Sequence, residues 1–341
     1  MRDKINGSAQ APRMIDVARL AGVSQQTVSR VLNGNVYVSE ELRERVEQAV
    51  RHLGYRRNKS ARALVTNETM HLGVITVGTA QYGPSRALFG VALQARSRGY
   101  ATSLVSLDDA NRANMRQALD HLLADGVDGI IILAPTAAAA DASESLDARV
   151  PLVMFQPGAV DGLHTVSHDE MLGACTATQH LVDLGHPTVH HLAGPTGWLA
   201  SEARIEGWRT TLGAAGKAAV EPRRGDWSAA SGYTVGLGLL QQDKPTAVFV
   251  ANDQMALGLL KAAAELGIRV PEALSVVGFD DIPESQYFCP SLTTMRLDFD
   301  EVGRRCVDRV INLIRHGEYF SQPVVAPYLI PRASTARHEK S

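Results

Sequence analysis

The chain has 341 residues, more than one hydrophobic core normally supports, so a small module beside one or two larger lobes is expected. Its composition is that of a soluble globular protein, with a formal net charge of -2. The charge is uneven, because residues 1–65 hold twelve Lys and Arg against six Asp and Glu, which leaves -8 for the remainder. A basic amino-terminal module on an acidic body predicts a polyanionic partner for the first part alone.

The cysteines and the amino terminus exclude further classes. Cys175, Cys289 and Cys306 are far apart, which matches neither a disulfide framework nor the close pairs of a zinc site. The opening MRDKINGSAQAPRM lacks the apolar core of a secretory signal, and no run approaches the roughly 20 apolar residues that span a bilayer. We therefore expect a cytoplasmic protein with reduced thiols, without membrane association, metal or cofactor.

The run DVARLAGVSQQTVSRVLN, residues 16–33, predicts two short helices joined by a tight turn. The first helix has an expected buried face made of Ile15, Val17, Ala18 and Ala21. Gly22 can end this helix in the left-handed conformation that glycine adopts cheaply. The hydroxyl of Ser24 can then cap the second helix by accepting from an amide of its first turn.

The second helix has two different faces. Val28, Val31 and Leu32 form its apolar face, whereas the other face carries amides, hydroxyls and a guanidinium without any carboxylate. These groups fit the edges of adenine and guanine in the major groove and do not repel phosphate. The pattern predicts a helix-turn-helix, and an ordinary helical hairpin with a solvated face is the alternative.

A third helix and a basic segment complete this module. SEELRERVEQAVRHLGY, residues 39–55, offers Ser39 as a cap and a stripe made of Leu42, Val46, Val50 and Leu53. The next run, RRNKSARALVTNET, is too short to be a stable free helix. It could become ordered when phosphates and a DNA groove receive it.

The module resembles the DNA-binding headpiece of the LacI family of bacterial repressors, with DVA..AGVS..TVSRVLN intact. The resemblance implies DNA contacts from Gln25, Gln26, Thr27, Ser29, Arg30, Asn33, Tyr37, Ala61 and Leu64. Leu64 occupies the place of a leucine that this family inserts into the minor groove from a hinge helix. Such a wedge unstacks a base step at a cost of a few kcal/mol, which added contacts recover. One departure is Arg13, where the family usually has a Ser or Thr cap.

From Met70 onwards, short β-rich runs alternate with amphipathic helices. The runs are HLGVITV, YATSLVSL, GIIILAP, PLVMFQ, VHHLAGP, AVFVAND and LSVVGFDD. This alternation predicts an α/β body in two lobes, with parallel sheets covered by helices on both faces. The expected domains are a headpiece at 1–57, a hinge at 58–69 and a body at 70–341, with lobe 1 at about 70–166 and 299–326 and lobe 2 at about 167–298 and 327–341.

Polar residues follow several of these strands, at the edge where open parallel sheets bind ligands. They are Gln156, Asn252, Asp253, Asp280 and Asp281, and Arg204 lies in the helix after VHHLAGP. Arg204, Asn252 and Asp280 offer fixed donors and acceptors, which suit a polyhydroxylated ligand. Asp253 could equally cap a helix, and Arg204 with Asp280 could be a structural ion pair.

Aromatic residues could complete such a site. Trp227 would stack against the apolar face of a sugar ring, and Phe299 would add a second apolar wall. Trp198 is expected at the mouth of the cleft and Trp208 in the core. The alternative for Trp227 is also a place in the core.

The resemblance to the LacI family extends to about residue 335, through GDWSAASG, FVANDQMALG, SVVGFDD and SLTTMRLDF. It implies a periplasmic-binding-protein-like body with effector contacts from Ser85, Gln156, Arg204, Trp227, Asn252, Asp280 and Phe299. The implied ligand is a galactoside. However, Gln156, Val166, Ala200 and Leu297 replace an aspartate, a phenylalanine, a serine and a glutamine of the galactoside-binding member. Because buried hydroxyl contacts discriminate strongly, the identity of the sugar stays open.

The predicted function is a transcriptional repressor that binds near-palindromic operator DNA as a homodimer and responds to a small sugar. A regulator that needs its ligand as a corepressor has the same architecture. The tail STARHEKS has no leucine heptads, so a dimer is expected. A free sugar-binding protein is one rival, but it would need a signal peptide and no headpiece. An enzyme is not predicted, since no phosphate loop or nucleophile elbow occurs.

Overall fold

The computed structural model describes residues 12–32, 37–55, 68–78, 81–144, 146–156, 164–317 and 323–339. The chain divides into two compact units, residues 1–69 and 70–341. Asn33, Ala61 and Leu64, which were expected to contact DNA, lie outside the described residues. No helix within the described ranges is long and apolar enough to cross a membrane.

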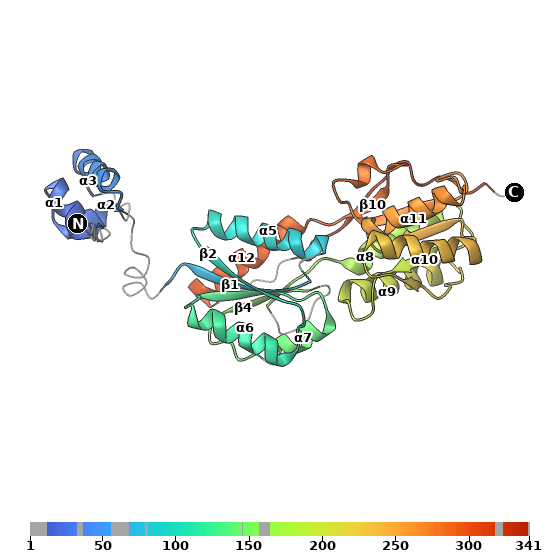
Figure 1. Ribbon diagram of the computed structural model, residues 1–341, viewed down its shortest axis with the longest axis horizontal. Coiled ribbons are helices and arrows are strands. Elements are labelled where there is room, and N and C mark those ends of the chain that lie inside the picture. Colours follow the sequence, from blue (N-terminus) through green and yellow to red (C-terminus); the bar gives the residue numbers. More distant parts are fainter. Residues whose placement is uncertain are drawn as a thin grey trace, which may run out of the picture. The chain divides into compact units, whose positions relative to one another are not determined.

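The described part of the first unit contains three helices, α1 (Met14–Ala21), α2 (Gln25–Leu32) and α3 (Glu40–Leu53) (Figure 1). Its core is formed by small and β-branched side chains, namely Val17, Ala18, Ala21, Val28, Val31, Val46 and Ala49. The expectation that Ile15 belongs to this buried face is wrong, because its side chain is 40% exposed. A helix of eight residues makes just over two turns and buries only one narrow apolar stripe, and Ile15 lies outside that stripe.

The expected helix ends are confirmed. Gly22 ends α1 in the left-handed region with φ 64°. The Ser24 hydroxyl accepts from the backbone N–H of Thr27 at 3.1 Å, and the Ser39 hydroxyl accepts from that of Leu42 at 3.4 Å. Each hydroxyl thus pairs an amide that has no partner within its own helix.

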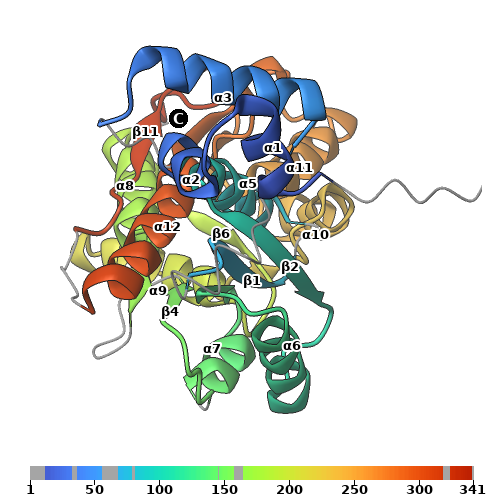
Figure 2. The same ribbon diagram turned by 90° about the vertical axis from the view of Figure 1, so that its left-hand side faces the viewer.

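The second unit contains two sheets, and each defines a lobe. Lobe 1 has a parallel sheet of order β2-β1-β3-β4-β5. Its strands are β1 (His71–Val77), β2 (Ala101–Leu107), β3 (Gly129–Leu133), β4 (Leu152–Phe155) and β5 (Thr165–Val166). One face is covered by α5 (Tyr82–Ser97) and α12 (Phe299–His316), and the other by α6 (Arg112–Ala124) and α7 (Ala137–Glu144) (Figures 1 and 2). Strand β3 is therefore buried throughout.

Lobe 2 has a sheet of order β11-β10-β9-β8-β6-β7, parallel except for β11. Its strands are β6 (His190–Ala193), β7 (Arg223–Arg224), β8 (Ala247–Val250), β9 (Ser275–Asp280), β10 (Thr293–Arg296) and β11 (Tyr328–Ile330). Two helix pairs cover it, α8 (Glu170–Asp183) with α9 (Leu199–Ala214), and α10 (Ala229–Gln242) with α11 (Asp253–Glu265) (Figure 1). A short 3-10 helix, η1 (Ser285–Tyr287), follows β9.

The chain passes between the lobes at residues 167–169, 297–298 and 323–327. The first and third passages pair with each other, because Val325 donates to the carbonyl of Ser167 at 3.1 Å and accepts from Asp169 at 3.3 Å. These short connections keep the carboxyl ends of the strands of both sheets near one cavity, which both lobes line.

Candidate DNA-binding face and effector cavity

Helix α2 presents its polar residues outward. Gln25, Gln26 and Arg30 are exposed, Thr27 and Ser29 are half-buried, and Val28 on the opposite side is fully buried. Tyr37, just before α3, is 94% exposed. The division into a packed apolar face and an outward polar face is the one that the sequence predicts. A helix anchored in this way can enter a major groove without losing its own core.

One cavity of the second unit lies between the lobes and has an empty volume of about 510 Å³ including its opening to solvent. Its lining residues are Gln81, Tyr82, Gly83, Pro84, Pro135, Phe155, Glu170, Trp198, Ala200, Arg204, Trp227, Asn252, Asp280 and Phe299. Five of the seven residues expected to contact an effector are among them. A concave, mostly apolar site with a few convergent polar groups is typical of small-molecule binding.

Arg204 is the centre of the polar wall. Its side chain is buried, and its Nε donates to Glu170 Oε2 at 2.9 Å while a terminal nitrogen donates to Asp280 Oδ1 at 3.4 Å. Its other terminal nitrogen donates to the carbonyl of Ala251. The guanidinium lies over the ring of Phe279, 3.8 Å from the ring centroid. One buried cation thus orders two buried carboxylates.

Asn252 joins this wall from the start of α11. Its Oδ1 accepts from the backbone N–H of Met255 at 2.9 Å, so Asn252 is the cap of this helix. Its Nδ2 donates to the carbonyl of Trp227 at 3.0 Å. The carboxamide is therefore held in one orientation before any ligand binds.

Asp280 ends β9 in an unusual backbone conformation. Its φ is 102°, and φ of Asp281 is 51°, both in the left-handed region that non-glycine residues rarely adopt. Burial raises the pKa of the Asp280 carboxyl from 3.8 to about 7, an effect that the adjacent Arg204 opposes. A ligand hydroxyl that donates to this carboxylate would favour its ionised form.

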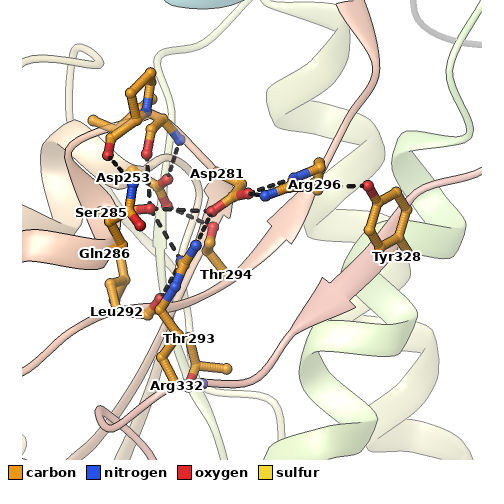
Figure 3. Close-up of polar contacts among 12 residues, drawn as sticks. Asp253, Asp281, Ser285, Gln286, Leu292, Thr293, Thr294, Arg296, Tyr328 and Arg332 are labelled. Atoms are coloured by element: carbon orange, nitrogen blue, oxygen red, sulfur yellow. Dashed lines mark hydrogen bonds and ion pairs between the residues drawn. The ribbon is translucent and has the colours of Figure 1, made fainter.

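A polar network holds the turn after Asp280 (Figure 3). Asp253 is fully buried, and its carboxylate accepts from the Ile282 backbone N–H at 2.8 Å and from the Thr294 hydroxyl at 2.6 Å. Asp281 lies between two guanidinium groups, those of Arg296 and Arg332 (Figure 3). The strained turn is therefore fixed from both sides, which holds Asp280 towards the cavity.

The remaining walls are mostly aromatic. The rings of Trp198 and Trp227 meet edge to face with centroids 5.7 Å apart, and those of Tyr82 and Phe299 do so at 5.9 Å. Trp227 is 7% exposed, and its φ is 76°. Together with the polar wall, these rings give the cavity one side for hydroxyl groups and others for an apolar ring face.

Two loops, one from each lobe, meet at the cavity wall and form what we call the interlobe clasp, residues 135–137 and 197–199. The backbone N–H of Ala137 donates to the carbonyl of Gly197, and that of Leu199 donates to the carbonyl of Pro135, each at 3.0 Å. Thr136 and Trp198 thereby form an isolated antiparallel bridge. Both hydrogen bonds of the clasp join backbone atoms.

The structure places the other expected residues as follows. Ser85 lies in the first turn of α5 and Gln156 follows β4, and neither lines the cavity, although their neighbours Pro84 and Phe155 do. The Gln156 side chain is buried, and its Oε1 has no hydrogen-bond partner among the residues that the structure describes. Asp253 and Asp281 belong to the supporting network instead of the cavity lining.

Sequence reasoning missed Glu170 and Tyr82. Glu170 begins α8 and is the closer partner of Arg204, but an acidic residue in a first helical turn is common and gave no signal. Tyr82 begins α5 shortly after β1, so the rule that ligands gather beyond strand ends could have found it. Trp198 lines the cavity and Trp208 is fully buried, as expected.

Comparisons with known proteins agree with this architecture. Residues 13–58 match the model of the bacterial regulatory proteins of the lacI family, and residues 178–335 match that of a periplasmic binding protein-like domain. The chain is 34% identical to the lactose operon repressor of Escherichia coli K12 over 94% of its own length and 90% of the relative's. It is 32% identical to the ribose operon repressor of the same strain, with 94% and 99% covered.

A crystal structure of the lac repressor dimer bound to operator and the anti-inducer ONPF has a TM-score of 0.84 to this chain. The two chains are 33% identical, and the match covers 96% of this chain and 100% of that one. Both domain models match, and the alignments with the relatives cover nearly the whole chain. The chain belongs to the LacI family of bacterial regulatory proteins and is a DNA-binding transcriptional repressor regulated by a small effector.

Proposed function

We propose that the effector of this repressor is a sugar, bound in the interlobe cavity by Arg204, Asn252 and Asp280. The observation that carries this proposal is the pairing of one buried polar wall with aromatic walls in a single cavity. Each sugar hydroxyl both donates and accepts, so it can bridge a guanidinium, a carboxamide and a carboxylate. Trp227 and Phe299 would cover the apolar C–H faces of the ring.

The relatives support a sugar but differ in which one, since their names refer to lactose and to ribose. A galactoside is our leading candidate. Four positions bear on this choice, because Gln156, Val166, Ala200 and Leu297 stand where the galactoside-binding relative has an aspartate, a phenylalanine, a serine and a glutamine. Ser85 and Gln156 stay in the proposed contact set because they adjoin the lining residues Pro84 and Phe155.

On the DNA side, we propose that two headpieces of a homodimer read the halves of a near-palindromic operator. The base contacts assigned to α2 and its surroundings are Gln25, Gln26, Thr27, Ser29, Arg30, Asn33 and Tyr37. Ala61 would contact the DNA, and the wedge residue Leu64 would insert at the centre, where the two hinges meet. Operator DNA as the partner would place the repressor on the nucleoid. We also propose that the cavity binds its sugar without turnover.

Coupling between the two sites requires that the sugar prefers one arrangement of the lobes. If that arrangement separates the two hinge segments, their helices lose mutual support and the operator is released. A sugar can weaken operator affinity only by its preference for the released state, and the operator must weaken sugar affinity by the same factor. If the ligand is instead a corepressor, it strengthens operator affinity, and the same architecture allows this.

A two-stage experiment tests this function. A thermal-shift screen of mono- and disaccharides should yield a ligand that raises the melting temperature, because binding to the folded state stabilises it. Gel shifts with promoter fragments then show whether that ligand weakens or strengthens DNA binding. If no saccharide shifts the melting temperature, the assignment of the effector class is wrong, and the family assignment stands.

Base recognition by the headpiece needs its own test. Gln26→Ala should relax the preference among bases by about 1–3 kcal/mol, with a smaller loss of total affinity, because a side-chain amide reads base edges. Leu64→Ala should weaken operator binding strongly and leave sugar binding unchanged. A uniform loss across sequences for Gln26→Ala would instead make it a backbone contact.

A further inference from the structure

The position of the Trp227 ring depends on a glycine. A Cβ atom built on Gly194, the residue after β6, would lie 2.2, 2.4 and 2.6 Å from Cη2, Cζ2 and Cζ3 of Trp227. Contacts below 3.0 Å essentially never occur for a real Cβ, so the ring occupies the space that any other side chain would need. The six-membered ring of Trp227 therefore lies directly against the backbone of Gly194.

The backbone of Gly194 does not itself require glycine. The glycines with positive φ lie elsewhere in the described chain, so an alanine could adopt the conformation at 194 without strain. The backbone of Trp227 is held independently, since its carbonyl accepts from Asn252 Nδ2 at 3.0 Å. A side chain at 194 would therefore displace the ring, and the cavity is the open space beside it.

Phe299 shows the same arrangement in lobe 1. A Cβ on Gly83 would lie 2.8 and 2.9 Å from its Cε1 and Cζ. Gly83 is in the first turn of α5 and has no positive φ, and glycine inside a helix is about 0.8–1.0 kcal/mol less favourable than alanine. Here too, the glycine leaves room for a ring of the cavity wall.

We propose that Gly194 and Gly83 are positioning residues of the effector cavity, which set how far the rings of Trp227 and Phe299 project into it. We call the two pairs the glycine seats. The inference rests on the proposed function, because the seats matter for regulation only if a ligand occupies this cavity. They would fix the width available to a flat, apolar ring face, which a pyranose presents and a branched chain does not.

A stability cycle without ligand tests the seat itself. Gly194→Ala should lower the melting temperature by on the order of 5 °C, because overpacking a filled site is destabilising. In a Trp227→Ala background the same substitution should leave the melting temperature almost unchanged, since the obstructing ring is gone. An equal loss in both backgrounds would overturn the inference, as would failure of both Gly194→Ala proteins to fold. Folding of the double variant alone would support it.

Gly213→Ala is the matched control, since Gly213 lies in α9 and a Cβ there would meet nothing within 4 Å. It should leave the melting temperature unchanged or raise it slightly. The same cycle applies to Gly83→Ala in the presence and absence of Phe299→Ala. Gly83→Ala should again lower the melting temperature only when the Phe299 ring is present.

Ligand titrations test the consequence for binding. The probes are methyl β-D-galactoside, methyl β-D-glucoside and D-ribose, and the one that binds the wild type is used with the variants. Gly194→Ala should bind it at least tenfold more weakly, whereas Gly213→Ala should bind it as the wild type does. Equal affinity of Gly194→Ala and the wild type would refute the positioning role. If the wild type binds none of the probes, this counts against the proposed function. The stability cycle would still show whether the two glycines position the rings of Trp227 and Phe299.

Discussion

The two lobes contribute different chemistry to one cavity. Lobe 2 supplies the buried polar wall, through Glu170, Arg204, Asn252 and Asp280. Lobe 1 supplies mostly apolar and aromatic surface, namely Tyr82, Gly83, Pro84, Pro135, Phe155 and Phe299, with Gln81 as its polar member. The hydrogen-bonding groups thus belong mainly to the lobe whose strand ends carry fixed side chains. Lobe 1 faces that wall across the cavity.

This asymmetry separates the residues that recognise the ligand, in lobe 2, from those that enclose it, in lobe 1. The polar groups of lobe 2 are held by one another and by the network around Asp253 and Asp281, so their positions do not depend on lobe 1. Lobe 1 meets lobe 2 beside the cavity through the backbone hydrogen bonds of the clasp. We therefore expect substitutions in lobe 2 to abolish binding and those in lobe 1 to weaken it or to change its rate.

The largest effect is expected for Arg204→Met. This change leaves Glu170 and Asp280 buried without their cation, which should cost about 3–5 kcal/mol in the free energy of unfolding and remove sugar binding. Urea denaturation measures the first effect and calorimetric titration the second. Arg224→Met is the control, because its ion pair with Glu202 is partly exposed and should contribute no more than about 1 kcal/mol. Equal losses for the two variants would disprove the central role of Arg204.

Asp280 should make sugar binding depend on pH. Its folded-state pKa is raised to about 7, so its protonated form stabilises the fold at low pH, and this contribution is lost as pH rises through about 7. A hydroxyl that donates to the carboxylate needs the ionised form. Sugar affinity should therefore fall below about pH 7, approaching tenfold per pH unit.

Asp280→Asn should bind at least about a hundredfold more weakly and without this pH dependence, because it cannot ionise. Titrations on both sides of pH 7 check the slope for each protein. A wild-type affinity that is the same at both pH values would contradict a role for the ionised carboxylate.

The clasp should control the rate of ligand exchange. Leu199→Pro removes one donor of the clasp, yet position 199 is the first residue of α9, where proline is well tolerated. Trp198 before it has φ -87° and ψ 120°, which a following proline allows. Sugar dissociation should become about three- to tenfold faster, as expected for one lost hydrogen bond.

Stopped-flow displacement measures this rate. Arg112→Pro is the matched control, since it places proline at the first residue of α6, far along the chain from either clasp loop and exposed. Dissociation from this control should match the wild type. An unchanged rate for Leu199→Pro would show that the clasp does not limit exchange.

The smallest effect is expected for Phe299→Leu in lobe 1. Replacing the ring keeps an apolar wall but loses its flat face, so sugar affinity should fall by about fivefold, or roughly 1 kcal/mol. Calorimetric titration checks this, and the melting temperature serves as a folding control. A loss as large as that of Asp280→Asn would show that lobe 1 recognises the ligand as directly as lobe 2.

Most of the fold could be predicted from the sequence, because long periodic segments carry their own signal. The seven expected β-rich runs contain β1, β2, β3, β4, β6, β8 and β9. The strands that were not expected, β5, β7, β10 and β11, are two to four residues long and lie mostly at sheet edges. Strands β5, β7 and β11 have only two or three residues, which is too short to show periodicity, so their pairing depends on tertiary contacts.

The site was predictable in part. Asn252 and Asp280 follow strands, so a general rule for parallel sheets places them correctly. The rule cannot tell which of two adjacent polar residues faces a cavity, and at 252–253 the cap is Asn252 while Asp253 supports the turn. Glu170 and the glycine seats depend on contacts between residues distant in the sequence, which no local pattern contains.

Occupancy of the interlobe cavity and operator binding should be linked, and a thermodynamic cycle measures this linkage. The cycle measures operator affinity with and without a saturating sugar, and sugar affinity with and without saturating operator DNA. We predict that both ratios differ from one by about 5- to 150-fold and are equal, as linkage requires. A sugar that binds the cavity tightly while leaving operator affinity unchanged would show that the two sites are not linked.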